Sequence, residues 1–188
     1  GQTDSLVGLL YKELDEVTRP SSRVEIRIQL AELLEGKENK VEEVFHQRIM
    51  AIAEGAEVDH QLEQLTSHAH QSIAMDQLAK VLRERIDDVT DSRLRIRLLH
   101  FTAELLETEI RSLPKATELL EQIRMESPGD AKALKALRRI YDEIGEVDAL
   151  VDVMEELEGA KGSDDPTGRV DLMVERATLQ HRVLNNSH

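Results

Sequence analysis

The sequence predicts an all-α protein, an α-solenoid in which antiparallel helix pairs follow one another along the chain. Three observations carry this prediction: the composition, a helical apolar pattern that recurs at a fixed interval, and turn residues between the patterns. Aromatic residues make up only 2% of the chain, whereas hydrophobic residues make up 40%. A core of leucine, isoleucine, valine, alanine and methionine favours helices over sheets, in which β-branched and aromatic side chains dominate.

The helical pattern recurs at intervals of 72 residues. Residues 4–17 place leucine or valine at helical spacing on one face, and residues 76–89 repeat that spacing 72 positions later. Residues 148–157 begin a third copy after a further 72. The segment Ala-Glu-Leu-Leu-Glu occurs at 31–35 and again, at the same offset, at 103–107. We therefore expect one structural unit that occurs more than twice along the chain.

The third copy is displaced in its second helix. Arg95 then matches Arg169 and Ala103 matches Ala177, an offset of 74 residues. The two extra residues fall in the polar stretch 159–168, for which we expect a loop; a weak hinge is the alternative.

Residues 23–30 and 93–98 alternate polar and apolar side chains, as half-buried strands do. Each segment continues without a break into Ala-Glu-Leu-Leu-Glu, a strong helix former. The first also splits into two helical stripes, one through Ile28 and Ala31 and one through Ile26 and Leu30. We predict a helix that is covered by neighbours on two sides.

Turn residues separate the predicted helices. Proline is placed at or just before helix starts, where its missing N–H matters least, and glycine where helices end. The prolines are Pro20, Pro114 and Pro128, the glycines are Gly36, Gly55 and Gly145, and the N-cap candidates are Ser112, Asp130 and Ser163 or Asp164.

One stretch, residues 93–145, carries the spacing of a known repeat signature. Its A-x3-F…P half is formed by Ala116, Leu120 and Pro128, and its W-x2-L-G-x2-Y half by Leu134, Leu137 and Tyr141. In these residues the chain resembles the tetratricopeptide repeat family, with leucine in place of Phe and Trp, and with Arg138 in place of Gly. The offset of 72 is close to two repeats of about 34 residues. The resemblance implies about ten helices in a right-handed superhelical array, with a concave face that binds proteins or peptides.

Composition argues against several classes of partner. The net charge is −14, with 24 basic and 38 acidic residues, which disfavours binding to nucleic acid and to anionic membranes. No apolar run is long enough to cross a bilayer, so no membrane insertion is expected. The chain has no cysteine, which excludes disulfides and thiolate chemistry. The compartment stays open, with the cytoplasm favoured over export.

No catalytic constellation, cofactor site or metal site is expected. The sequence has no Gly-rich phosphate loop, no G-x-S-x-G and no H-E-x-x-H. His60, His68 and His70 share one predicted helix, but a helical H-x-H directs its two rings to nearly opposite faces. We therefore expect a chain without enzyme activity and without cofactor, in which these histidines are surface or interhelix residues.

Lys132, Lys135 and Arg139 follow i, i+3, i+7 spacing on the predicted helix 131–144. The resemblance places them on the inner face of the array, where a basic ridge would hold an acidic peptide or a carboxylate. The alternative is a solvated face balanced by neighbouring acids. Phe101 is a second candidate on the same face, either as a peptide anchor or as part of the core.

We expect residues 1–188 to form a single tetratricopeptide-like array that is a segment of a longer protein. Its expected function is that of a scaffold for a peptide or partner protein. Two alternatives remain: a spacer or oligomerisation segment that self-associates through the apolar faces of its terminal helices, and a non-catalytic repeat region of a multidomain enzyme.

Overall fold

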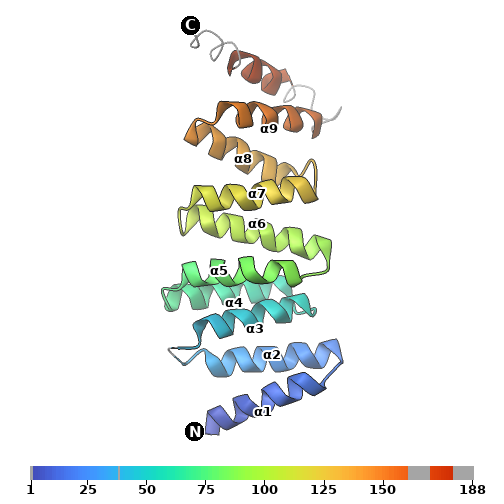
Figure 1. Cartoon of the computed structure of the whole chain (residues 1–188), viewed down its shortest axis with the longest axis vertical. Coiled ribbons are helices and arrows are strands. Elements are labelled where there is room, and N and C mark those ends of the chain that lie inside the picture. The colour runs from blue at the N-terminus through green and yellow to red at the C-terminus, as the bar shows by residue number, and fades with distance from the viewer. Residues whose placement is uncertain (1, 38, 161–169, 180–188) are drawn as a thin grey trace. The chain divides into compact units, whose positions relative to one another are not determined.

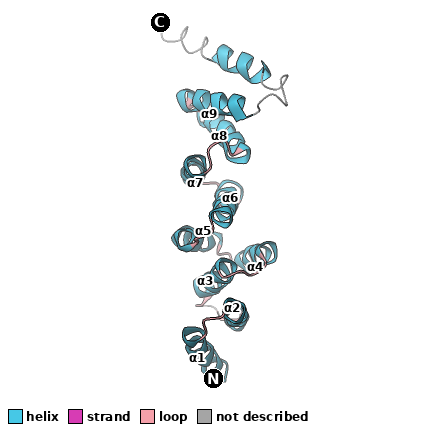
Figure 2. Cartoon of the chain, turned by 90° about the vertical axis from the view of Figure 1, so that its right-hand side faces the viewer, coloured by secondary structure: helices cyan, strands magenta, loops and turns pink. Residues whose placement is uncertain are grey.

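The computed structural model describes residues 2–37, 39–160 and 170–179, and over these residues the chain consists of helices and loops without any strand (Figure 2). The helices are α1 (Gln2–Glu16), α2 (Pro20–Leu34), α3 (Val41–Ala53), α4 (Val58–Gln71), α5 (Met75–Arg85) with the short 3-10 helix η1 (Ile86–Asp88), α6 (Ser92–Thr108), α7 (Leu113–Glu126), α8 (Ala131–Ile144) and α9 (Val147–Ala160). Residues 170–179 are also helical. The all-α prediction is confirmed.

The chain divides into two compact units, which are described separately. The first contains residues Gly1–Leu98 and Thr108–Ile110, and the second contains Leu99–Glu107 and Arg111–His188. Within each unit, helices that are consecutive in the sequence lie side by side and are joined by short turns (Figure 1). Each described helix is too short or too polar to cross a membrane.

In the first unit, α2 is covered on two sides. Ile26 and Leu30 pack with Leu10 and Leu14 of α1. Ala31 and Leu34 pack with Val44 of α3. Full burial of a leucine contributes about 1.5–3 kcal/mol, so packing against both neighbours stabilises α2. The alternating segment 23–30 is therefore helical because two partners require two apolar stripes, as the sequence predicted.

In the second unit, α7, α8 and α9 pack consecutively. The Asp130 side chain caps α8 by accepting a hydrogen bond from the Ala133 N–H at 2.8 Å. Gly145 ends the helix in the left-handed conformation, with φ of 76°. Ser112 occupies the N-cap position of α7, as predicted, but its side chain makes no capping hydrogen bond. The N-cap candidates Ser163 and Asp164 lie outside the described residues.

Burial follows the 72-residue repeat. Residues that match at this offset are buried in both copies, for example Ile26 and Leu98, Ala31 and Ala103, Val44 and Ala116, Ala51 and Ile123, Leu65 and Leu137, and Leu78 and Leu150. The helix–turn pattern seen in the sequence is thus a repeat of core positions.

At five further positions that match at this offset, the two copies bury side chains of different chemistry. The first copy buries polar side chains where the second buries apolar ones, and the matched pairs are Arg27 and Leu99, Gln47 and Leu119, Arg48 and Leu120, Gln61 and Ala133, and His68 and Ile140. Four of the polar members are held by hydrogen bonds between helices, whereas the Nε2 atom of His68 is buried without a hydrogen-bond partner. Arg27 donates to Gln47 Oε1 at 2.8 Å and to Glu54 Oε2 at 2.7 Å. Arg48 donates to Gln61 Oε1 at 2.8 Å and forms an ion pair with Glu35.

Candidate functional site

The basic residues predicted on α8 lie together on its exposed face. The helix buries Leu134, Leu137 and Ile140, which recur at intervals of three residues. The side chains of Lys132, Lys135 and Arg139, on other positions of the helix, are exposed. The amphipathic period of the helix therefore presents the three cations on the side opposite its core.

Two of the three cations are paired with carboxylates of α6. Lys132 Nζ lies 3.2 Å from Glu104 Oε2, and Arg139 forms an ion pair with Glu107. The hydrogen bond with Glu107 raises the pKa of Arg139. Lys135 has no carboxylate partner among the described residues. Acidic side chains thus pair with the cations at both ends of the predicted ridge, as the alternative interpretation expected. The cation in the middle of the ridge, Lys135, is the one without such a partner among the described residues.

The two ion pairs differ in their exposure to solvent. The side chains of Lys132 and Glu104 are 65% and 62% exposed, whereas that of Glu107 is only 12% exposed. An exposed pair contributes about 0–1 kcal/mol, so a ligand carboxylate competes with Glu104 at little cost. Glu107 is held more firmly. The side chain of Arg139 is itself 59% exposed, so it differs from Lys132 in the burial of its partner and not in its own exposure.

Phe101 is half-buried on α6. It precedes Glu104 by three residues, so the two side chains are neighbours on the helix surface. Since Glu104 reaches Lys132, the structure brings Phe101 and the basic ridge to the same part of the second unit. Its partial burial leaves part of the ring exposed to solvent and is compatible with either predicted role.

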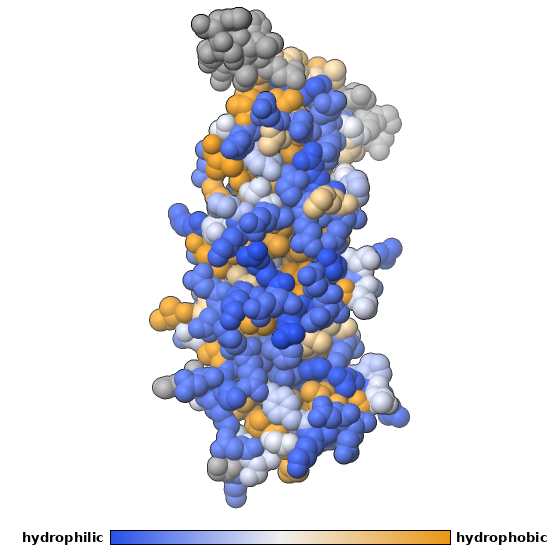
Figure 3. Space-filling model, in the orientation of Figure 1, coloured by the Kyte–Doolittle hydropathy of each residue, from blue (hydrophilic) through white to orange (hydrophobic). Residues whose placement is uncertain are grey.

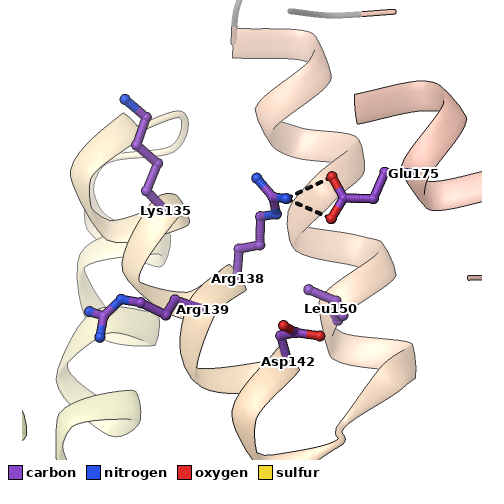
Figure 4. Close-up of a pocket in the computed structure, with 6 residues that line it drawn as sticks. All are labelled: Lys135, Arg138, Arg139, Asp142, Leu150 and Glu175. Atoms are coloured by element: carbon purple, nitrogen blue, oxygen red, sulfur yellow. Dashed lines mark hydrogen bonds and ion pairs between the residues drawn. The ribbon is translucent and has the colours of Figure 1, made fainter. Parts of the chain in front are cut away.

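Beside the ridge lies an open pocket of about 240 Å³. Figure 4 shows Arg138 reaching from α8 to Glu175 in the helix 170–179, with both carboxylate oxygens in contact with the guanidinium at 2.6 and 2.7 Å. Asp142 lies one turn further along α8, and Leu150 of α9 supplies an apolar wall. Lys135 and Arg139 point away from this ion pair (Figure 4). The pocket offers one apolar contact next to charges of both signs.

Sequence reasoning missed the acidic partners and Arg138. Glu104 and Glu107 belong to the repeated Ala-Glu-Leu-Leu-Glu segment, which was read only as a helix former. The signal was present, because two acids three residues apart lie on one face of a helix, as do the cations of the helix 131–144 that are three and seven residues apart. The face of the molecule seen in Figure 3 is mostly hydrophilic, with small apolar patches.

The histidines do not converge. His68 is buried, with its ring edge-on to Phe45 at a centroid distance of 5.8 Å, whereas the His70 side chain is 57% exposed. Burial lowers the pKa of His68. In the part of the chain that the structure describes, no three His, Asp or Glu side chains are grouped so that they could hold a metal ion.

Comparison of the chain with protein-family models, with curated proteins and with solved structures found no match. The interpretation of the α6–α8 face therefore rests on the residues themselves.

Proposed function

We propose that the chain is a protein-interaction scaffold without a catalytic site, which binds an acidic peptide or the acidic segment of a partner protein. The binding face is formed by Phe101 and Glu104 of α6 and by Lys132 and Lys135 of α8. In this proposal the helix pairs continue as a single right-handed, tetratricopeptide-like solenoid over residues 1–188, whose concave side carries that face.

The observation that carries the proposal is Lys135, an exposed cation with no carboxylate partner among the described residues of a chain with net charge −14. Lys132, one turn away, is paired only through an exposed contact with Glu104. A bound carboxylate would contact both ammonium groups, and the half-buried Phe101 would receive an apolar side chain of the same ligand.

The test uses a fluorescein-labelled decapeptide rich in glutamate and its isosteric glutamine counterpart. We expect the full chain to bind the glutamate peptide more tightly at low salt, because screening weakens contacts between exposed charges. Reversal of the ridge by K132E and K135E should reduce affinity at least tenfold, about 1.4 kcal/mol. The double variant K12E/K115E reverses two exposed lysines outside the ridge, in α1 and α7, and is the matched control for net charge. Equal binding by the ridge variant, in fluorescence anisotropy, would remove the proposal.

A second candidate function, self-association, is favoured by the exposed apolar residues of the first and last described helices. Leu6 and Leu9 of α1 are 45% and 62% exposed, and Val170 and Val174 are 56% and 61% exposed. Light scattering at increasing concentration separates the two functions, because end-to-end packing predicts species larger than a monomer and the scaffold does not require them. The third possibility, a repeat region attached to an enzyme, does not require these apolar residues to be exposed.

A further inference from the structure

The helix formed by residues 170–179 packs through one side, and its opposite side is exposed among the residues that the structure describes. Leu172 is buried, and Arg176 binds Glu158 of α9 at 2.9 Å through Nε. The opposite side carries an apolar stripe at i, i+3, i+4, i+7 spacing, formed by Val170, Met173, Val174 and Ala177, all exposed. We call these four residues the terminal stripe. Such a stripe at helical spacing is the surface by which one helix packs on another.

The internal repeat identifies what covers this surface elsewhere in the chain. Two repeat steps, of 72 and 74 residues, relate the terminal stripe to Val24, Arg27, Ile28 and Ala31 of α2. Ala31 is fully buried there, in a cluster with Val44 of α3, whereas Ala177 is exposed. The counterpart of Leu172 is Ile26, and both side chains are buried. The terminal stripe therefore corresponds to the face of α2 that packs against α3. No helix covers the terminal stripe among the described residues.

The residue at the position of Arg27 indicates what kind of helix fits. In α2 this arginine is buried and hydrogen bonds to Gln47 of α3 at 2.8 Å. In the second copy both positions are apolar, with Leu99 in α6 and Leu119 in α7, and both are buried. The terminal stripe has Met173 at this position. A helix of the α3 kind would bury its Gln47 amide against a thioether without a hydrogen-bond partner, whereas a helix of the α7 kind would place a leucine there.

We propose that the terminal stripe binds an amphipathic helix of the α7 kind, with apolar side chains at the positions of Ala116, Leu119 and Ile123. This surface is separate from the basic ridge, and its occupant is recognised by shape and apolar contact instead of charge. The proposal stands or falls independently of the scaffold function.

The test uses two labelled peptides, each held helical by a staple on its exposed side because isolated helices of this length are marginal. One has the sequence of residues 112–128, around α7, and the other that of residues 40–56, around α3. We expect the full chain to bind the α7 peptide and to bind the α3 peptide about tenfold more weakly, since one unpaired buried amide costs about that factor. V174D should abolish binding of the α7 peptide.

The decisive variant is M173R, which restores the arginine of α2. It should reverse the preference, because the guanidinium regains the glutamine of the α3 peptide and meets only leucine in the α7 peptide. Circular dichroism checks that each variant keeps its helix content. Absence of α7-peptide binding, equal binding to V174D, or a preference unchanged by M173R would each overturn the proposal. Concentration-dependent self-association that is lost in L9D and that competes with the peptide would also overturn it, in favour of a second copy as the occupant.

Discussion

Arg27 is a buried cation that joins α2 to α3 in the interior of the first unit. Its guanidinium donates to Gln47 and Glu54, and its side chain is only 8% exposed. Removal of one partner from such a buried group costs more than the group contributes, because the remaining partners lose hydration and gain no bond. The second copy avoids this demand by placing Leu99 and Leu119 at the matching positions.

The repeat therefore supplies its own test of Arg27. We expect R27L to lower the free energy of unfolding by about 3 kcal/mol, because Gln47 and Glu54 lose a buried donor. The double variant R27L/Q47L copies the apolar pair of the second unit and should recover at least about 1 kcal/mol, since Glu54 keeps its bond with Arg23 at 2.9 Å. Urea unfolding measures both values. A double variant less stable than R27L would contradict this account.

His68 gives a pH-dependent prediction at the same scale. Burial lowers its pKa, with Arg48 acting in the same direction and Glu35 opposing it. The stability contributed by neutral His68 is complete above its ordinary value of 6.5 and is lost as the pH falls through the lowered folded value. We expect H68I, which copies Ile140, to flatten the decline in unfolding free energy between about pH 7.5 and pH 5. The pKa of His46 is also lowered by burial, so part of the slope should remain.

At the scale of the helix, two glycines show how position decides the effect of one methyl group. Gly145 ends α8 with φ of 76°, a conformation that alanine adopts only with strain. Gly8 lies within α1, and a Cβ added there would meet nothing within 4 Å. We expect G145A to destabilise the chain by about 1–2 kcal/mol and G8A to stabilise it by about 0.5–1 kcal/mol. Thermal unfolding followed by circular dichroism distinguishes the opposite signs, and equal signs would exclude this explanation.

At the scale of the whole molecule, the two units differ in how many of their groups have a lowered pKa. In the first unit the pKa values of Glu43 and Glu54 are lowered, because hydrogen bonds from neighbouring side chains outweigh the effect of burial. Those of His46 and His68 are lowered by burial. In the second unit only Asp130 shows a lowered pKa among the described groups, where bonds from Ala133 and His100 outweigh burial. Groups with a lowered folded pKa contribute stability that disappears as the pH falls.

We therefore expect the first unit to unfold at a higher pH than the second during acid titration. The chain has two tyrosines and no tryptophan, and Tyr11 lies in the first unit and Tyr141 in the second. The variants Y11F and Y141F each leave one fluorescent reporter. The transition reported by Tyr11, in Y141F, should precede the one reported by Tyr141 as the pH is lowered. Coincident transitions would mean that the units unfold together and that their interiors do not set the order.

Much of this architecture could be predicted from the sequence. The segment 23–30 was assigned to a helix against its strand-like alternation, because two apolar stripes require neighbours on both sides. Pro20 and Gly145 marked a helix start and a helix end by backbone restrictions that any fold would respect. Spacing at 72 residues located the core positions, since burial of one helix face imposes a period on the chain itself.

Tertiary structure alone decided the partners of charged residues. Arg27 belongs to α2, whereas Gln47 and Glu54 belong to α3 and its C-cap, and nothing local in the sequence distinguishes a buried arginine from an exposed one. The same holds for Lys132 and Lys135, which are alike in the sequence and differ in that Glu104 reaches only the first. Helical periodicity is a local property that the chain carries in its spacing. Pairing of charges depends on which helices become neighbours, and that is determined only when the helices pack.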